Sequence, residues 1–282
     1  MIQPKTDPRP SHPIKMIALD LDGTLLRADK TVGPRTAEAL RAAHAKGVDI
    51  ALASGRMTPA MEKTAASLGF DCFIVSYNGA AVCDYASGGR KRLFHQPLSA
   101  TIARELYEWA RERRYQVNFY HEDVIVSEDA PHLMPYVNLY RGRTDSPYRL
   151  VKNLEDFMHH APTKLLIVVD PPVREKIDAE LRPRFSPRAT VIRTDPEFLE
   201  FLDPSVNKGC GVAKLAEIRG MTMANVLAMG DGENDVQMIG AAGFGVAVAN
   251  AFPEVKAVAK AVTRNDNDND AVAEAIERWV LQ

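Results

Sequence analysis

Cysteine, net positive charge and long apolar runs are all scarce in this sequence of 282 residues. The cysteines are Cys72, Cys83 and Cys210, widely spaced and without a CxxC pair, which argues against both a disulfide framework and a zinc site. We expect them to be buried free thiols in a reducing compartment. Lysine and arginine number 35 against 37 aspartates and glutamates, so no chain-wide positive field is present to attract nucleic acid.

A membrane-spanning segment is missing too, because no stretch approaches the ~20 apolar residues that a transmembrane helix needs. Residues 1–14 contain four prolines and no apolar run typical of a signal peptide, which predicts a flexible N-terminal tail. We therefore expect a cytoplasmic protein with a small-molecule partner, no nucleic acid and no membrane. The sequence leaves open whether the chain is a monomer or a homodimer.

What the sequence does contain is an alternation of short apolar runs with amphipathic segments. This pattern is typical of strands joined by crossover helices, and it predicts an α/β fold with a doubly wound parallel sheet. The predicted strands of this sheet are MIALD (16–20), VDIALA (48–53), FIVS (73–76), NVLAMG (225–230) and FGVAVA (244–249), and helices are predicted at 34–46, 59–68, 208–219, from Asn234 and from Ala271.

The middle of the chain has a different texture, with more prolines and aromatic residues. Four predicted strands, YQVNFYH, DVIVS, KLLIVVD and ATVIRT, are separated there by helical segments at 99–113 and 172–181. From Ser54 to Lys208 the chain spans 154 positions, whereas one or two βα units would need only about 30 residues each. The sequence therefore predicts a tail (1–14), a core (15–81 and 199–282) and an inserted α+β domain (82–198).

Polar side chains follow the predicted strands at the edge where ligands bind in an open parallel sheet. Asp, Ser and Asn are also favoured helix caps and turn residues, so each of them alone has an ordinary structural explanation. That explanation accounts less well for a lysine among several acids, because carboxylates repel one another without a counter-ion. The residues concerned are Asp20, Asp22, Ser54, Asn78, Lys208, Asp231 and Asp235.

A hard divalent cation would cancel this repulsion, and an all-oxygen ligand set favours Mg²⁺, which commonly also binds phosphate. The pattern thus indicates phosphoryl chemistry, in which one carboxylate attacks phosphorus and forms an aspartyl-phosphate. Asp22 lies two positions after Asp20, on the same side of an extended segment, so it can exchange protons with the leaving group and with water. Gly23 permits a tight turn, and Thr24 can hydrogen-bond nearby.

Four motifs carry a family resemblance: DLDGT (20–24), Ser54 in ALASGR, Lys208 in NKG, and GDGEND (230–235). In this order they resemble the motifs of the haloacid dehalogenase-like superfamily, and residues 230–251 are similar in particular to the Cof-type phosphatases. The resemblance extends from Lys15 to the end of the chain. It implies that the inserted domain is a type IIB cap, which closes over the crevice and selects the substrate.

The same resemblance implies roles for individual residues. Asp20 would be the nucleophile and Asp22 the general acid and base, with Ser54 and Lys208 holding the phosphoryl group. Mg²⁺ would be bound by Asp20, Asp231 and the main-chain carbonyl of Asp22, with Asn234 and Asp235 nearby as further ligands or their supports. The remaining candidates for contact with phosphate or substrate are Leu21, Gly23, Thr24, Gly55, Arg56, Asn78 and Asn234.

These residues lead us to expect a Mg²⁺-dependent phosphatase of small phosphorylated metabolites, such as a sugar phosphate, flavin mononucleotide or pyridoxal phosphate. A phosphomutase, which would pass the phosphoryl group to a second substrate hydroxyl, remains an alternative. So does a non-catalytic module that binds phosphate or a partner on the same scaffold.

The acidic stretch NDNDND (265–270) stands outside these motifs. It has Asp266, Asp268, Asp270 and Glu277 at the spacing of a calcium-binding loop, but Ala271 occupies the position where that loop requires glycine. We therefore favour a solvated turn that caps the following helix. Relatives commonly have a glycine at Ala271, so the loop itself is expected to differ here.

Overall fold

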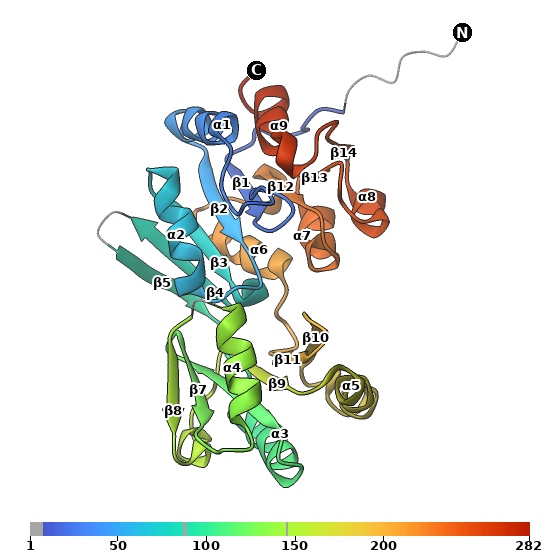
Figure 1. Ribbon diagram of the computed structural model, residues 1–282. Helices are drawn as coiled ribbons and strands as arrows, with labels where there is room; N and C mark the ends of the chain where they lie inside the picture. The colour runs from blue at the N-terminus through green and yellow to red at the C-terminus, as the bar shows by residue number, and fades with distance from the viewer. Residues whose placement is uncertain (1–7, 87–88, 145) are drawn as a thin grey trace. The chain divides into compact units, whose positions relative to one another are not determined.

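A computed structural model describes residues 8–86, 89–144 and 146–282 (Figure 1). Residues 1–7 of the expected tail lie outside this description. Contacts divide the chain into two compact units, each with its own sheet. The first unit comprises the chain up to Arg56, Met61–Phe94 and Asn207–Gln282, and the second comprises Met57–Ala60 and His95–Val206.

The first unit contains a sheet in the strand order β14-β13-β12-β1-β2-β3-β4-β5. Neighbouring strands from β14 to β3 run parallel, and β4 runs antiparallel to β3. The expected doubly wound parallel sheet is therefore confirmed. Its strands are β1 (Met16–Asp20), β2 (Asp49–Ala53), β3 (Cys72–Ser76), β4 (Ala81–Ala86), β5 (Gly89–His95), β12 (Val226–Gly230), β13 (Phe244–Ala247) and β14 (Ala261–Val262).

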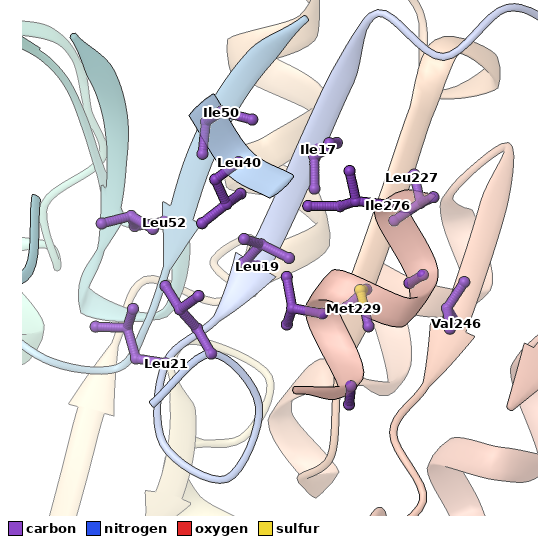
Figure 2. Packing of buried hydrophobic residues seen from close by; sticks show 14 of the residues in the cluster. Ile17, Leu19, Leu21, Leu40, Ile50, Leu52, Leu227, Met229, Val246 and Ile276 are labelled. Carbon is purple, nitrogen blue, oxygen red and sulfur yellow. The ribbon is translucent and has the colours of Figure 1, made fainter. Parts of the chain in front are cut away.

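Helices cover both faces of this sheet because successive side chains of a strand point to opposite sides. In β1, Ile17 and Leu19 belong to the cluster that holds α1, α2 and α9, whereas Met16 and Ala18 belong to the cluster that holds α6. Figure 2 shows the first of these clusters. The helices of this unit are α1 (Pro34–Ala45), α2 (Thr58–Leu68), α6 (Lys208–Ile218), α7 (Val236–Ala241), α8 (Pro253–Val258) and α9 (Ala271–Trp279).

The second unit contains a sheet in the order β10-β11-β9-β6-β7-β8, in which the ladders are antiparallel except for the parallel pair β7 and β8. Its apolar core includes Trp109, Phe119 and Phe201. The elements are α3 (Ala100–Glu112), β6 (Gln116–His121), β7 (Val124–Glu128), α4 (Met134–Arg143), β8 (Tyr148–Val151), β9 (Leu165–Val168), α5 (Pro171–Phe185), β10 (Thr190–Arg193) and β11 (Phe198–Leu202).

The boundaries of the second unit differ from the expected range of 82–198. Strands β4 and β5 extend the first sheet, so the inserted unit begins at His95. At the other end β11 pairs with β9 and β10 in the second sheet, and the unit continues to Val206. The reason is that strand periodicity predicts pairing but does not indicate which sheet a strand joins.

Residues 8–14 form neither helix nor strand, and contacts hold them to the first unit. The indole of Trp279 donates a hydrogen bond to the carbonyl of Pro8 (3.0 Å), and the Asn225 amide donates to that of Pro13 (3.1 Å). Ile14 packs against the apolar cluster of Figure 2. This part of the expected flexible tail is therefore attached to the folded chain.

The expectation that the cysteines are buried free thiols holds for two of the three. Cys72 and Cys83 are buried free thiols, but Cys210 is exposed, so the expectation that it is buried is wrong. Cys210 lies in the first turn of α6 between the buried residues Gly209 and Gly211, and its own side chain is exposed. Among the described residues, no helix combines the length and apolar character required to cross a membrane.

Candidate active site at the carboxyl edge of the first sheet

Strand register brings the motifs to one edge of the sheet. Leu19 pairs with Met229, so Asp20 stands level with Gly230 and next to the turn that holds Asp231. On the other side Asp20 itself pairs with Ala53, the residue before Ser54. The first, second and last motifs therefore meet because β1 lies between β12 and β2.

Lys208 is the centre of the site. Its ammonium donates to Asp20 Oδ1 (2.6 Å) and to Asp235 Oδ1 (2.7 Å), and all three side chains are buried. Lys208 is the first residue of α6, where the Asn207 side chain accepts from the main-chain N–H of Cys210 and caps the helix. Burial opposes charge on the lysine, but the two carboxylates outweigh it and raise the pKa of Lys208, which therefore stays charged.

Asp231 and Asp235 are held by the turn in which they lie. Asp231 Oδ1 accepts from the Thr24 hydroxyl (2.9 Å). Asp235 Oδ2 accepts from the main-chain N–H groups of Asp231 (3.1 Å) and Gly232 (3.0 Å). Both oxygens of Asp235 thus have donors, which makes this residue an anchor for Lys208 and for the turn.

Asp20, Asp231 and Asp235 each offer a carboxylate oxygen within 4.8 Å of the other two. Burial raises the pKa of Asp20 to about 8, and the neighbouring Asp235 and Asp231 add to that rise while Lys208 opposes it. One ammonium does not balance three carboxylates, so the cluster has the charge and the oxygen donors that suit a hard divalent cation. The residues present therefore fit Mg²⁺.

Asp22 has its own cationic partners. The Arg56 guanidinium binds it through two hydrogen bonds (2.9 and 2.6 Å), and Lys30 donates to Oδ1 (2.9 Å). Burial alone would raise the pKa of Asp22, but the bonds from Lys30 and Arg56 outweigh burial and lower it. The Asp22 side chain is 41% exposed, so it is the accessible carboxylate of the DLDGT motif.

Ser54, Asn78 and Asn234 line the neighbouring part of the edge. Ser54 is buried, and its hydroxyl accepts from the main-chain N–H of Arg56 (3.2 Å). Asn78 has a left-handed backbone (φ 54°), and its side-chain oxygen accepts from the Asn234 amide (3.0 Å). A β-carbon on Gly55 would lie 3.1 Å from the Asn78 amide, so glycine allows this close packing.

The DLDGT loop folds back on itself. The Leu21 carbonyl accepts from the N–H groups of Thr24 (3.4 Å) and Leu26 (2.8 Å), and the Leu21 side chain is buried in the cluster of Figure 2. Gly23 has φ +81°, and a β-carbon there would lie 2.4 Å from Asp231 Oδ2. The loop and the Asp231 turn can approach this closely only because residue 23 has no side chain.

The model of the haloacid dehalogenase-like hydrolase family matches residues 17–276. The chain belongs to this family. The resemblance inferred from the four motifs is therefore confirmed.

Individual relatives match over most of the chain. The 5-amino-6-(5-phospho-D-ribitylamino)uracil phosphatase of Bacillus subtilis is 31% identical over 269 residues, which cover 95% of this chain and 96% of the relative. The HMP-PP phosphatase of Cronobacter sakazakii is 29% identical over 85% of this chain and 86% of its own. A haloacid dehalogenase-like hydrolase from Bacteroides thetaiotaomicron superposes with a TM-score of 0.82 at 35% identity, covering 94% and 99% of the two chains.

The structure adds two residues that sequence reasoning missed. Lys30 binds Asp22, as described, and Asn250 donates through its side-chain amide to the carbonyl of Gly23 (2.7 Å). Asn250 follows β13 at the carboxyl edge of the sheet, so the rule that selected Ser54 and Asn78 would also have selected it. No comparable signal marks Lys30, because its role depends on the fold of the loop.

Proposed function

We propose that this hydrolase is a Mg²⁺-dependent phosphatase of small phosphorylated metabolites that acts through an aspartyl-phosphate on Asp20. The observation that carries the proposal is the buried Lys208 ammonium between Asp20 and Asp235, with Asp231 within 4.8 Å of both carboxylates. A lysine beside a nucleophilic carboxylate can neutralise the oxygens of the group being transferred. The phosphatase names of two relatives support the same reaction class.

In the first step, an Asp20 oxygen attacks phosphorus and the bond from phosphorus to the leaving-group oxygen breaks. Asp22 gives its proton to that oxygen. In the second step, water attacks the phosphorus of the aspartyl-phosphate, Asp22 takes back a proton, and inorganic phosphate leaves with Asp20 restored. Arg56 and Lys30 stabilise the ionised form of Asp22, which is the base of the second step. To act as the acid of the first step, Asp22 must take up a proton and give up these ion pairs.

Mg²⁺ would be held by Asp20, Asp231 and the main-chain carbonyl of Asp22, and it would supply positive charge for the phosphoryl oxygens. Asp235 supports this set through Lys208 and the main chain of the turn. Asn234 would complete the set or bind phosphate, and its bond to Asn78 holds it at the edge of the site.

The inserted unit is the segment that we propose as the cap, and its side chains would distinguish one leaving group from another. It has its own sheet and its own apolar core, as a separately moving element requires. Sugar phosphates and phosphorylated cofactors such as flavin mononucleotide or pyridoxal phosphate are the substrate classes we would test first.

The test is phosphate release from a panel of phosphorylated metabolites, with Mg²⁺ and with EDTA, by the wild type and by Asp20→Asn. We expect Mg²⁺-dependent turnover that Asp20→Asn abolishes and that Asp71→Asn, a change at an exposed aspartate outside the site, leaves unchanged. Transfer of the phosphoryl group to a second substrate hydroxyl would indicate a phosphomutase instead. Mg²⁺ binding without turnover on any ester would indicate the non-catalytic module.

A further inference from the structure

The DLDGT loop accepts hydrogen bonds from, and donates them to, a segment of the same chain that lies near its C-terminus. Beyond the end of β1 its main-chain groups no longer take part in the sheet, so other partners must satisfy them. Three of those partners, Asn250, Asn267 and Asp268, come from the loop after β13 and from the acidic turn 265–270. Together with Asp270, which binds the Arg27 side chain, we call them the C-terminal bracket.

Asn250 connects two motifs of the site. Its amide donates to the Gly23 carbonyl (2.7 Å). Two residues later, the main-chain N–H of Phe252 donates to the Asp231 carbonyl (2.9 Å). One short segment therefore determines the separation between the Gly23 turn and the Asp231 turn, where a β-carbon on Gly23 would already clash.

Asn267 continues the bracket. Its main-chain N–H donates to Asn250 Oδ1 (3.2 Å), which orients the Asn250 amide toward Gly23. Its side-chain amide donates to the Leu26 carbonyl (2.9 Å), and Asp268 accepts from the N–H of Ala28 (2.8 Å). The bracket thus contacts the DLDGT loop at three main-chain positions between 23 and 28.

The acidic side chains of the turn already have partners in the protein. Asp266 accepts from the main-chain and side-chain N–H groups of Asn269, and Asp270 accepts from Arg27 (3.0 Å) and Thr36 (3.0 Å). Glu277, the twelfth position of the calcium pattern, pairs with Arg35. Because Asp266, Asp270 and Glu277 already accept hydrogen bonds from residues of the chain, nothing in their arrangement points to calcium.

We propose that Asn250 and Asn267 are positioning residues that place Asp20, Asp22 and the Asp22 carbonyl for metal binding and phosphoryl transfer. This inference rests on the proposed function. The two asparagines do not contact the carboxylates of the site directly. They act through the main chain of residues 23–26, and supporting partners of this kind commonly change metal affinity or activity about 10- to 100-fold.

The test compares Asn250→Ala and Asn267→Ala with Asn269→Ala. Asn269 lies in the same turn, but its amide bonds to Asp266 and not to the DLDGT loop. We expect the first two variants to lower kcat about 10- to 100-fold and to raise the half-saturating Mg²⁺ concentration about tenfold, with substrate KM changed less than threefold. Asn269→Ala should stay within twofold of the wild type in all three.

The value of kcat at saturating Mg²⁺ separates positioning from mere destabilisation. Saturating metal refolds a destabilised variant by mass action and restores its rate, whereas a variant with a misplaced site stays slow. If an alanine variant fails to fold by circular dichroism, the isosteric Asn250→Asp and Asn267→Asp replace it. Equal effects in Asn269→Ala, or values within twofold of the wild type for Asn250→Ala and Asn267→Ala, would overturn the inference. If the wild type releases no phosphate, the proposed function fails independently of this inference. The rise in Tm on addition of Mg²⁺ then tests the positioning role: a smaller rise in Asn250→Ala and Asn267→Ala than in the wild type supports it, and an equal rise overturns it.

Discussion

Lys208 is the residue on which the charges of the site depend. It is buried with two carboxylates at hydrogen-bond distance, and a third carboxylate lies close to both. Removal of one partner from a buried ion pair is costly because the remaining charge loses its counter-ion in a place that water cannot reach. We therefore expect Lys208 to contribute both to the stability of the fold and to the chemistry of the site.

Replacement of Lys208 should therefore lower the stability of the protein. We expect Lys208→Met to lower the free energy of unfolding by about 3–5 kcal/mol, because Asp20 and Asp235 would lose their shared cation. Lys214→Met on the same helix removes an exposed ion pair with Glu217 and should cost less than about 1 kcal/mol. Urea denaturation of both variants measures the two values, and equal costs would contradict a special role for Lys208.

The raised pKa of Asp20 makes the stability of the protein in EDTA depend on pH. Between about pH 4, where an unfolded aspartate releases its proton, and about pH 8, the folded state holds a proton that the unfolded state has lost. The free energy of unfolding should therefore fall as the pH rises through this window, by up to about 1.4 kcal/mol per pH unit.

Urea denaturation at pH 5, 6, 7 and 8 in EDTA tests this, with Asp20→Asn as the comparison. The amide does not titrate, so the difference in unfolding free energy between wild type and variant should move steadily with pH in favour of the variant. Parallel curves for the two proteins would show that Asp20 has an ordinary pKa.

At the scale of elements, the site is a set of loops whose positions the sheet decides. The carboxyl end of β1 is next to that of β12 on one side and that of β2 on the other. The loop after β1 must then turn within a few residues to avoid the Asp231 turn, and Gly23 makes this possible with φ +81°. A residue with a side chain would be strained by that backbone conformation and would also clash with Asp231.

A comparison of Gly23→Ala with Gly47→Ala separates the backbone strain of a positive φ from the steric clash with Asp231. Both glycines have nearly the same backbone (φ +81° and +82°), but an added β-carbon at Gly47 meets nothing within 4 Å. We expect both variants to lose about 1–2 kcal/mol of stability, and Gly23→Ala alone to lose about 100-fold in kcat by displacing Asp231. Phosphate release and thermal denaturation measure the two effects. An active Gly23→Ala enzyme would show that the two loops tolerate separation.

The elements that the sequence predicted well are those with strong periodicity. β1, β2, β3, β12 and β13 and the helices α1, α2, α6 and α9 were predicted to within a few residues, because apolar runs between Gly and Pro signals define them locally. Strands β4, β5 and β8 and helices α4 and α8 are among the elements that were not predicted. Their side chains are polar on one face or mixed, and they become strand or helix through neighbours that are distant in the sequence.

At the scale of the whole molecule, the chain consists of two units with separate cores. Among the described residues, the apolar cluster of the second unit runs from Leu98 to Phe201, and no strand of the first sheet contributes to it. Every residue of the proposed metal site belongs to the first unit. A ligand that binds there stabilises that unit by mass action and gives the other no direct contribution.

Scanning calorimetry should reveal this division. We expect a polypeptide of residues 95–206 to unfold cooperatively at a Tm that Mg²⁺ does not change. In the full chain, Mg²⁺ at 100 times its dissociation constant should stabilise the first unit by about 2.7 kcal/mol and raise its transition. A polypeptide that is unfolded alone, or that Mg²⁺ stabilises, would contradict the independence of the two units.

The sequence by itself determined the family, the order of the motifs and the oxygen-rich, lysine-containing character of the site, because these depend on residue types and local spacing. Only the tertiary structure decided that Lys208 joins Asp20 to Asp235, that Asp22 pairs with Arg56 and Lys30, and that Asn250 holds Gly23. These contacts join segments far apart in the chain or depend on the exact turn of a loop. Strand order and register determine which of them meet, and a local pattern does not encode either.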